Sequence, residues 1–114
     1  MVNRGSGDMI SIDAEQTLFE INNVTDPMNY HTFLFFNGLT EGDEIIYRAY
    51  VYDEYSAAYS IYWERPANWN TLNLGKERAI RIPWVATTNY KITIEKTLGS
   101  NSTVRYQWYQ VIVP

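Results

Sequence analysis

Few side chains in this sequence could perform chemistry, and the first to consider is the one histidine. The chain has 114 residues, with a single histidine at His31 and no cysteine. A serine or threonine nucleophile needs a base to activate it, and His31 is the only imidazole available. His31 begins an apolar segment, where an imidazole usually packs, and no serine has the Gly-x-Ser-x-Gly spacing. The sequence therefore predicts no nucleophilic catalysis.

Carboxylates are the other groups with catalytic potential, because a glycosidase needs only two of them. The candidates are Glu41, Asp43, Glu44, Asp53, Glu54 and Glu64. The first three lie in and beside a turn, and nothing in the sequence places a second carboxylate across a cleft from them. We predict that the protein is not an enzyme and has no catalytic residue and no cofactor, with a small glycan-active or metal-dependent enzyme as the remaining alternative.

The same acidic turn raises the question of a metal. Glu41, Asp43 and Glu44 offer the oxygen ligands that Ca²⁺ prefers, but their spacing is not the twelve-residue pattern of a helical calcium loop. The absence of cysteine excludes a disulfide framework and a thiolate zinc site. We predict no metal site, with calcium at this turn as the alternative.

Side chains suited to contact are abundant by comparison. The chain holds ten tyrosines, four tryptophans and four phenylalanines, more than one small core requires. Some should therefore reach the surface, where flat rings anchor protein interfaces or stack on sugars. The predicted interface or ligand contacts are Tyr50, Tyr52, Tyr55, Tyr62, Trp69 and Tyr109, and core packing accounts for the other rings.

Composition narrows the possible partners. Hydrophobic residues make up 46% of the chain and charged residues 19%, with a net charge of −4. Nucleic-acid binding depends on clustered cations, so a net-acidic chain with scattered lysines and arginines argues against it. No apolar run is long enough for a membrane span or a signal peptide. We expect a homo-oligomer or a larger protein assembly, with a glycan as a possible partner.

Alternation of apolar and polar residues predicts an all-β protein. The expected fold is a single antiparallel β-sandwich, jelly-roll or immunoglobulin-like, with about eight short strands. Residues 90–95 form the cleanest strand, and Pro83 places residues 80–84 at a sheet edge or strand end. Two further strands with one dry face each are expected, one formed by Ile80, Ile82 and Trp84 and another by Ala57, Tyr59, Ile61 and Trp63. The predicted core includes Ile82, Ile92, Ile94 and Trp108.

Other segments complete this outline. Residues 30–36 and 44–53 are apolar on both faces, so we expect both to be covered on two sides and paired through a hairpin at residues 37–43. A turn at 98–102 leads to a last strand, 103–113, whose change of phase suggests a bulge or burial on both sides. Weaker strands are expected at 9–12 and 17–23. Residues 1–8 should form a flexible arm before a single domain of residues 9–114, with a binding loop at 65–75.

Two segments carry a family resemblance. Residues 38–51 (GLTEGDEIIYRAYV) and residues 90–97 (YKITIEKT) resemble small β-sandwich proteins of phages and archaeal viruses, over about residues 38–114. The resemblance implies a virion or assembly component, such as a capsid decoration, spike or tail accessory domain, and assigns no catalytic residue. We therefore predict a structural protein of a virion or an extracellular surface. The alternative is a carbohydrate-binding module that uses exposed tyrosine and tryptophan.

Overall fold

The computed structural model describes residues 2–22 and 25–112, and this part of the chain contains strands and no helix. No helix capable of crossing a membrane therefore occurs among these residues. The strands are β1 (Val2–Ile10), β2 (Gln16–Ile21), β3 (Met28–Phe35), β4 (Glu44–Asp53), β5 (Ala58–Asn68), β6 (Ala79–Thr87), β7 (Tyr90–Leu98) and β8 (Thr103–Ile112). Met1, Asn23 and Val113, which the sequence predictions included, lie outside the described residues.

Strand pairing is nested. β1 pairs with β8, β2 with β7, β3 with β6 and β4 with β5, all antiparallel. A long hairpin that turns between β4 and β5 and then rolls up gives this pattern. Rolling up also pairs β3 with β8 and β4 with β7 through backbone hydrogen bonds. The products are sheet I, in the order β1-β8-β3-β6, and sheet II, in the order β2-β7-β4-β5.

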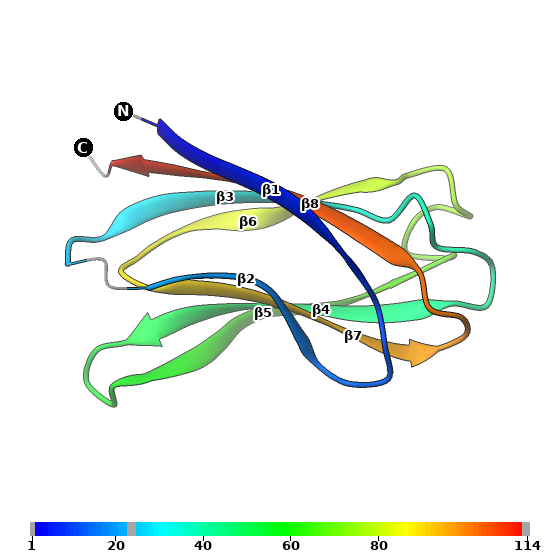
Figure 1. Ribbon diagram of the computed structural model, residues 1–114, viewed down its shortest axis with the longest axis horizontal. Coiled ribbons are helices and arrows are strands. Elements are labelled where there is room, and N and C mark those ends of the chain that lie inside the picture. Colours follow the sequence, from blue (N-terminus) through cyan, green and yellow to red (C-terminus); the bar gives the residue numbers. More distant parts are fainter. Residues whose placement is uncertain (1, 23–24, 113–114) are drawn as a thin grey trace.

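The two sheets form the layers of a sandwich (Figure 1). The predicted all-β sandwich is confirmed, and of its two predicted forms the strand order is that of a jelly roll. In the immunoglobulin fold the first two strands are neighbours in one sheet, whereas here β1 and β2 belong to different sheets.

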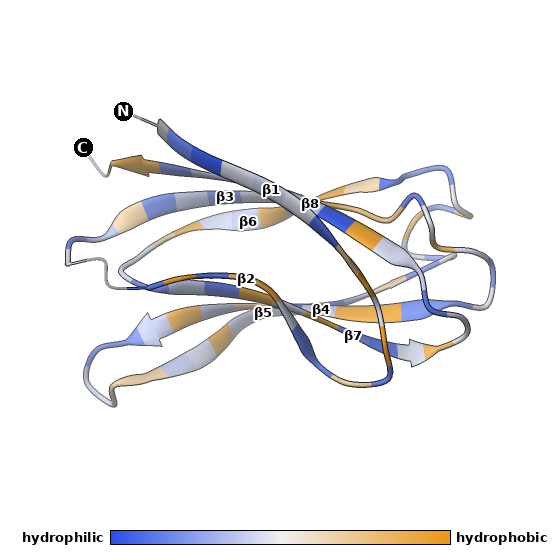
Figure 2. Cartoon of the chain, viewed as in Figure 1, coloured by the Kyte–Doolittle hydropathy of each residue, from blue (hydrophilic) through white to orange (hydrophobic). Residues whose placement is uncertain are grey.

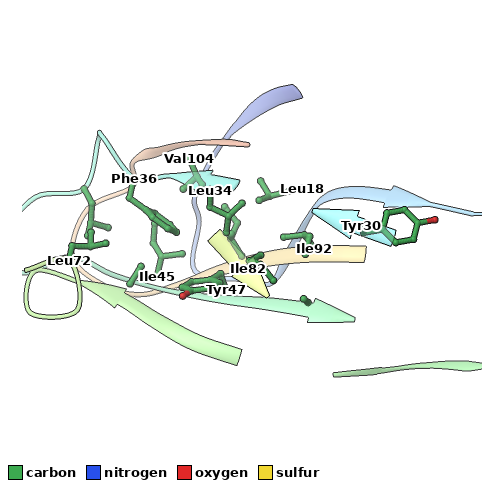
Figure 3. Close-up of a cluster of buried hydrophobic side chains, with 14 of the residues drawn as sticks. Leu18, Tyr30, Leu34, Phe36, Ile45, Tyr47, Leu72, Ile82, Ile92 and Val104 are labelled. Atoms are coloured by element: carbon green, nitrogen blue, oxygen red, sulfur yellow. The ribbon is translucent and has the colours of Figure 1, made fainter. Parts of the chain in front are cut away.

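Alternate residues of both sheets fill the space between the layers (Figure 3). Among the predicted core residues, Ile82, Ile92 and Ile94 are fully buried, which confirms them, whereas Trp108 is only half-buried. The other buried apolar side chains of the strands are Leu18, Tyr30, Leu34, Ile45, Tyr47, Ala49, Ala67, Tyr90 and Val104.

A buried polar network joins the two sheets beside the turn between β6 and β7. The ring of Tyr30 on β3 stacks on that of Tyr90 on β7, with centroids 4.6 Å apart and planes inclined by 7°. The Tyr30 hydroxyl donates to the carbonyl of Thr88 at 3.2 Å and accepts from Gln110 Nε2 at 3.1 Å. Thr32 Oγ1 lies 2.9 Å from the Tyr90 hydroxyl. Each buried phenol is thus paired, so its burial carries no unsatisfied group.

The predicted hairpin between residues 30–36 and 44–53 is wrong. β3 is bonded on its two sides by β6 and β8, and β4 by β5 and β7, so residues 37–43 cross from one sheet to the other. Both strands bury only one face. Their outer residues, including Phe33 and Ile46, are half-buried by neighbours in the same sheet and lie under no other described element.

Asp43 fixes the end of that crossing. Its buried carboxylate accepts hydrogen bonds from Thr40 N at 2.9 Å, Thr40 Oγ1 at 2.8 Å and Ser100 N at 2.8 Å. Gly99 has a φ of 82°, and a Cβ there would lie 2.1 Å from Asp43 Oδ1, so the turn requires glycine. Burial would raise the pKa of Asp43, but the hydrogen bonds from Thr40 and Ser100 outweigh it and hold the pKa below its ordinary value.

Two bulges change which residues face inward. The β3–β6 register shifts between Tyr30 and Thr32, opposite Pro83, which has no N–H to donate. The predicted dry face is therefore wrong at Trp84, which points outward and is 56% exposed. Pro83 does lie in an edge strand, as predicted, because β6 ends its sheet.

The second bulge divides the predicted dry face of β5. The β4–β5 register shifts between Ala49 and Tyr50, so Trp63 pairs with the buried Ala49 while Ile61 pairs with the outward Tyr50. Ile61 is accordingly 50% exposed. β8 shows no register shift against β1 or β3, so a bulge there is ruled out and its alternation continues through Tyr109.

The predicted flexible arm is also corrected, because residues 2–8 belong to β1 and pair with β8. Gly5 lies opposite Trp108, and Gly7 opposite Tyr106. A Cβ on Gly5 would come within 2.6 Å of the Trp108 ring, and one on Gly7 within 2.5 Å of the Tyr106 hydroxyl. β1 thus leaves space that rings from β8 occupy, which is why its own sequence lacks an apolar pattern.

We expect Ile94→Ala to lower the free energy of unfolding by about 2–5 kcal/mol, because a fully buried side chain leaves a cavity. Denaturant melts measure this loss. Ile61→Ala, on an exposed strand position, is the control and should change stability by less than about 1 kcal/mol. Equal losses in the two variants would mean that the inner and outer faces are assigned incorrectly.

Asp43→Asn should destabilise the fold by about 1–3 kcal/mol at pH 7, because it places an amide against N–H donors. The pKa of Asp43 lies below 3.8 in the folded state, so its stabilisation is complete well above pH 3.8 and is lost as the pH falls through the folded value. Denaturant melts across this range should show the two proteins converging in acid. The exposed Glu41→Gln is the control, and a difference independent of pH would contradict the assignment.

Candidate interaction surfaces

The outer face of sheet I carries rings and arginines, and we name it the arginine face. Its aromatic and imidazole rings are His31, Phe33, Phe35, Trp84 and Tyr109, and its cations are Arg4, Arg81 and Arg105. No other described element covers these residues. Figure 2 shows that apolar residues recur along both sheets and are not confined to one block.

Cross-strand pairing brings these rings together. His31 lies opposite Tyr109, and its ring stacks on Trp84 with centroids 6.1 Å apart. Phe35 lies opposite Arg105, whose guanidinium carbon is 5.9 Å from the phenyl centroid. The result is a surface of half-buried rings and the exposed Trp84, interrupted by Gln107 opposite Phe33 and bordered by guanidinium groups.

The charge of this face is opposite to that of the whole chain. Arg81 lies opposite Phe33, and Arg4 opposite Tyr109. Asp8, opposite Arg105, is the carboxylate that pairing brings into this group. The arginine face is thus locally basic in a protein of net charge −4.

The outer face of sheet II is acidic, and we name it the glutamate face. Its charged side chains are Glu15, Glu20, Arg48, Glu64, Lys91 and Glu95, and its rings are Tyr50, Tyr52 and Tyr59. Arg48 Nη1 lies 3.3 Å from Glu15 and 2.9 Å from Glu95, and its Nε contacts Glu64. One guanidinium therefore serves several carboxylates, which leaves the cluster negative.

The carboxylate at the centre of this cluster stays ionised. Glu15 accepts hydrogen bonds from Tyr50 Oη at 2.5 Å and Thr93 Oγ1 at 2.6 Å. Burial would raise the pKa of Glu15, but these bonds and the charge of Arg48 outweigh it and lower the pKa. A general acid requires a raised pKa, so the cluster is suited to charge pairing.

Tyrosines flank the ionic cluster. Lys91 Nζ lies between two rings, 4.5 Å from the centroid of Tyr50 and 4.7 Å from that of Tyr59. Tyr52 meets Tyr59 edge to face, with centroids 5.8 Å apart. Tyr50 and Tyr59 therefore both make cation–π contacts with the same lysine.

The predicted contact residues separate onto different surfaces. Tyr50 and Tyr52 lie on the glutamate face and Tyr109 on the arginine face, while Tyr55 is fully exposed in the turn between β4 and β5. The structure does not bring them into one site.

Tyr62 is a correction to the predicted surface set. It packs against the core, and its hydroxyl donates to the carbonyl of Pro83 on β6. Burial raises the pKa of Tyr62 to about 12. The cause is the β4–β5 bulge, in which Tyr62 is the extra residue beside the inward Trp63.

Trp69 lies in the connection between β5 and β6, as predicted, although β5 extends to Asn68 and shortens the loop. The side chain of this loop that is buried in the core is Leu72, which is 1% exposed. Trp69 is half-buried, and a Cβ on Gly75 would lie 2.4 Å from its ring. The ring borders a shallow hollow whose lining includes Glu41, Glu44, Asn68 and Asn70 together with the apolar Leu74 and Leu98.

The acidic turn offers little to a calcium ion. The hydrogen bonds of Asp43 already occupy both of its carboxylate oxygens. Within residues 2–22 and 25–112, no group of three or more metal-ligating side chains is arranged to hold an ion.

Sequence reasoning missed Trp84, Tyr59, Phe33 and Phe35 as surface rings. The sequence could only show that one alternating set of the apolar residues 33–36 must face outward in a two-layer sandwich, and the structure shows that Leu34 and Phe36 are the buried set. No comparable signal existed for Trp84 or Tyr59, because bulges set their direction.

No protein-family model matches the chain, and no curated protein matches it. Solved structures are similar in fold. A protein of Bacillus endospore appendages, which form disulfide-linked pili, superposes with a TM-score of 0.58 at 10% identity, covering 99% of this chain and 88% of that one. VP2 of the infectious bursal disease virus subviral particle gives 0.55 at 14% identity, covering 98% of this chain and 32% of its own.

The structure of the Gt strain of the same virus gives a TM-score of 0.55 at 13% identity, and the match covers 98% of this chain and 33% of that chain. This chain therefore spans about a third of each viral protein chain that it matches. At these identities the similarity shows a shared β-sandwich fold.

Proposed function

We propose that this chain is a non-enzymatic structural or assembly protein that acts through protein–protein contact at its arginine face. The observation that carries the proposal is the group of outward rings on sheet I, bordered by arginines and including the 56% exposed Trp84. Tryptophan, tyrosine and arginine are the residues most enriched where protein interfaces derive their binding energy. A lone soluble domain rarely leaves such a surface uncovered.

The fold comparisons support this proposal. The similar proteins named above come from pili and from a viral particle, both of which are assemblies of protein subunits. This chain has no cysteine, so its contacts would be non-covalent, unlike the disulfide links of the pili. A virion accessory component or another extracellular surface protein, as the sequence resemblance implies, is the setting we propose.

The described carboxylates favour this role over a catalytic one. Glu15, Glu64 and Glu95 gather about Arg48, and all three are ion-paired with it. Glycoside hydrolysis needs one carboxyl group held neutral by a raised pKa, whereas Glu15 has a lowered pKa.

We expect the wild-type protein to self-associate at tens of micromolar, and Trp84→Glu to return it to a monomer. A charge at this position opposes burial of the rings around it. Light scattering coupled to gel filtration measures the mass, and an unchanged thermal midpoint shows that the variant is folded. Tyr55→Glu, in the exposed turn, is the matched control. A wild-type protein that stays monomeric at hundreds of micromolar would contradict self-association.

A carbohydrate-binding module is the second candidate, and the hollow beside Trp69 favours it, because a flat ring bordered by amide and carboxylate side chains suits a sugar. If this hollow binds glycans, Trp69→Ala should abolish binding on a glycan array while Trp84→Glu leaves it intact. No glycan signal from the wild-type protein would eliminate this candidate.

A further inference from the structure

We propose that the arginine face of one copy docks on the glutamate face of the next copy, so that the chains assemble head to tail. This inference rests on the proposed function, and it names the partner of the arginine face as a second copy of this chain. It also assigns a role to the glutamate face, which that function leaves unused.

The two faces are complementary in charge. The arginine face presents Arg4, Arg81 and Arg105, while the glutamate face presents Glu15, Glu20, Glu64 and Glu95 around Arg48 and Lys91. Two arginine faces packed on each other would oppose like charges, which is unfavourable. The glutamate face supplies the opposite charge on the same molecule.

The glutamate face can also accept new cations without losing its own pairing. The single guanidinium of Arg48 is shared among Glu15, Glu64 and Glu95. Glu64 keeps 49% of its side chain exposed, and Glu95 keeps 32%. Carboxylate oxygens therefore remain open to incoming arginines, whose planar groups suit bidentate pairing.

Both faces combine rings with charges. On the arginine face His31 and Trp84 stack, and on the glutamate face Tyr50 and Tyr59 enclose Lys91. Aromatic rings and arginine are enriched in specific interfaces, so the rings and guanidinium groups of these faces suit a contact.

The position of the faces sets the geometry of assembly. They belong to different layers of the sandwich and point to opposite sides of the molecule (Figure 1). A contact between unlike faces is heterologous, so every added copy leaves one face of each kind free. Repetition gives a ring if the rotation closes and a filament if it does not.

Two charge-reversal variants test the inference. Arg81→Glu/Arg105→Glu alters the arginine face, and Glu20→Lys/Glu64→Lys alters the glutamate face. Each alone should be monomeric at a concentration where the wild-type protein assembles. Because each retains the face that the other lacks, a mixture should contain a 1:1 dimer. Glu41→Lys/Glu54→Lys, on exposed loops, is the matched charge control and should assemble like the wild-type protein.

Analytical ultracentrifugation distinguishes the outcomes. If the arginine-face variant is monomeric but the glutamate-face variant still assembles, the arginine face pairs with itself; the head-to-tail inference is then wrong and the proposed function stands. If both variants are monomeric and the mixture stays monomeric, the inference is also wrong. If neither variant nor Trp84→Glu reduces assembly, the arginine face is not the contact and the proposed function fails.

A variant that loses its thermal transition is replaced by its neutral form, Arg81→Gln/Arg105→Gln or Glu20→Gln/Glu64→Gln. We expect either neutral double variant to raise the dissociation constant of the assembly at least tenfold. An unchanged constant would overturn the inference.

Discussion

The constraint on which the whole structure depends is that a strand in a two-layer sandwich can bury only one of its faces. On β3 the buried residues are Tyr30, Thr32 and Leu34, and the residues between them face outward. The core is complete without those outward rings. Their presence on an uncovered sheet therefore calls for an explanation outside the folded chain.

The register of the strands decides which residues face outward, and the buried polar network around Tyr30 and Tyr90 helps to hold that register. A slip of one residue would exchange the two faces of a strand. Tyr30 stacks on Tyr90, and Gln110 bonds Tyr30 from the neighbouring strand. Asn3 Nδ2 donates to Gln110 Oε1 at 2.8 Å, which extends the network to β1 at the sheet edge. The surfaces proposed for assembly thus depend on contacts inside the core.

Local patterns were enough to predict the strands and much of the core. The alternation at Tyr90, Ile92 and Ile94 identified the inner face of β7 correctly. The pairing of β3 with β6 and β8 was not predictable in this way, because it joins segments far apart in the chain. The short spacing at residues 37–43 instead favoured a hairpin that the structure lacks.

The errors at single residues have physical causes. Pro83 cannot donate to its neighbour, and the resulting bulge turns Trp84 outward. Gly5 and Gly7 suggested a loose arm because glycine is typical of flexible segments. In the structure they instead leave room for rings that belong to β8. In both places the neighbouring strand determines the local structure, so the segment's own sequence does not predict it.

The candidate surfaces were only partly predictable for the same reason. Tyr50, Tyr52 and Tyr109 were expected at the surface and lie on outer faces. The separation of charge was hidden, because a net charge of −4 gives no sign that Arg4, Arg81 and Arg105 gather on one sheet. Only the nested pairing of strands brings those distant positions together.

The most direct test of this account is hydroxyl-radical footprinting of the wild-type protein across a concentration series, with labelling of each ring measured by mass spectrometry. If both outer faces are contact surfaces, labelling of Trp84 and Tyr59 should fall together as the protein assembles, while labelling of the fully exposed Tyr55 stays constant. Labelling of Trp84 and Tyr59 that is equally strong in the dispersed and the assembled protein would contradict the account.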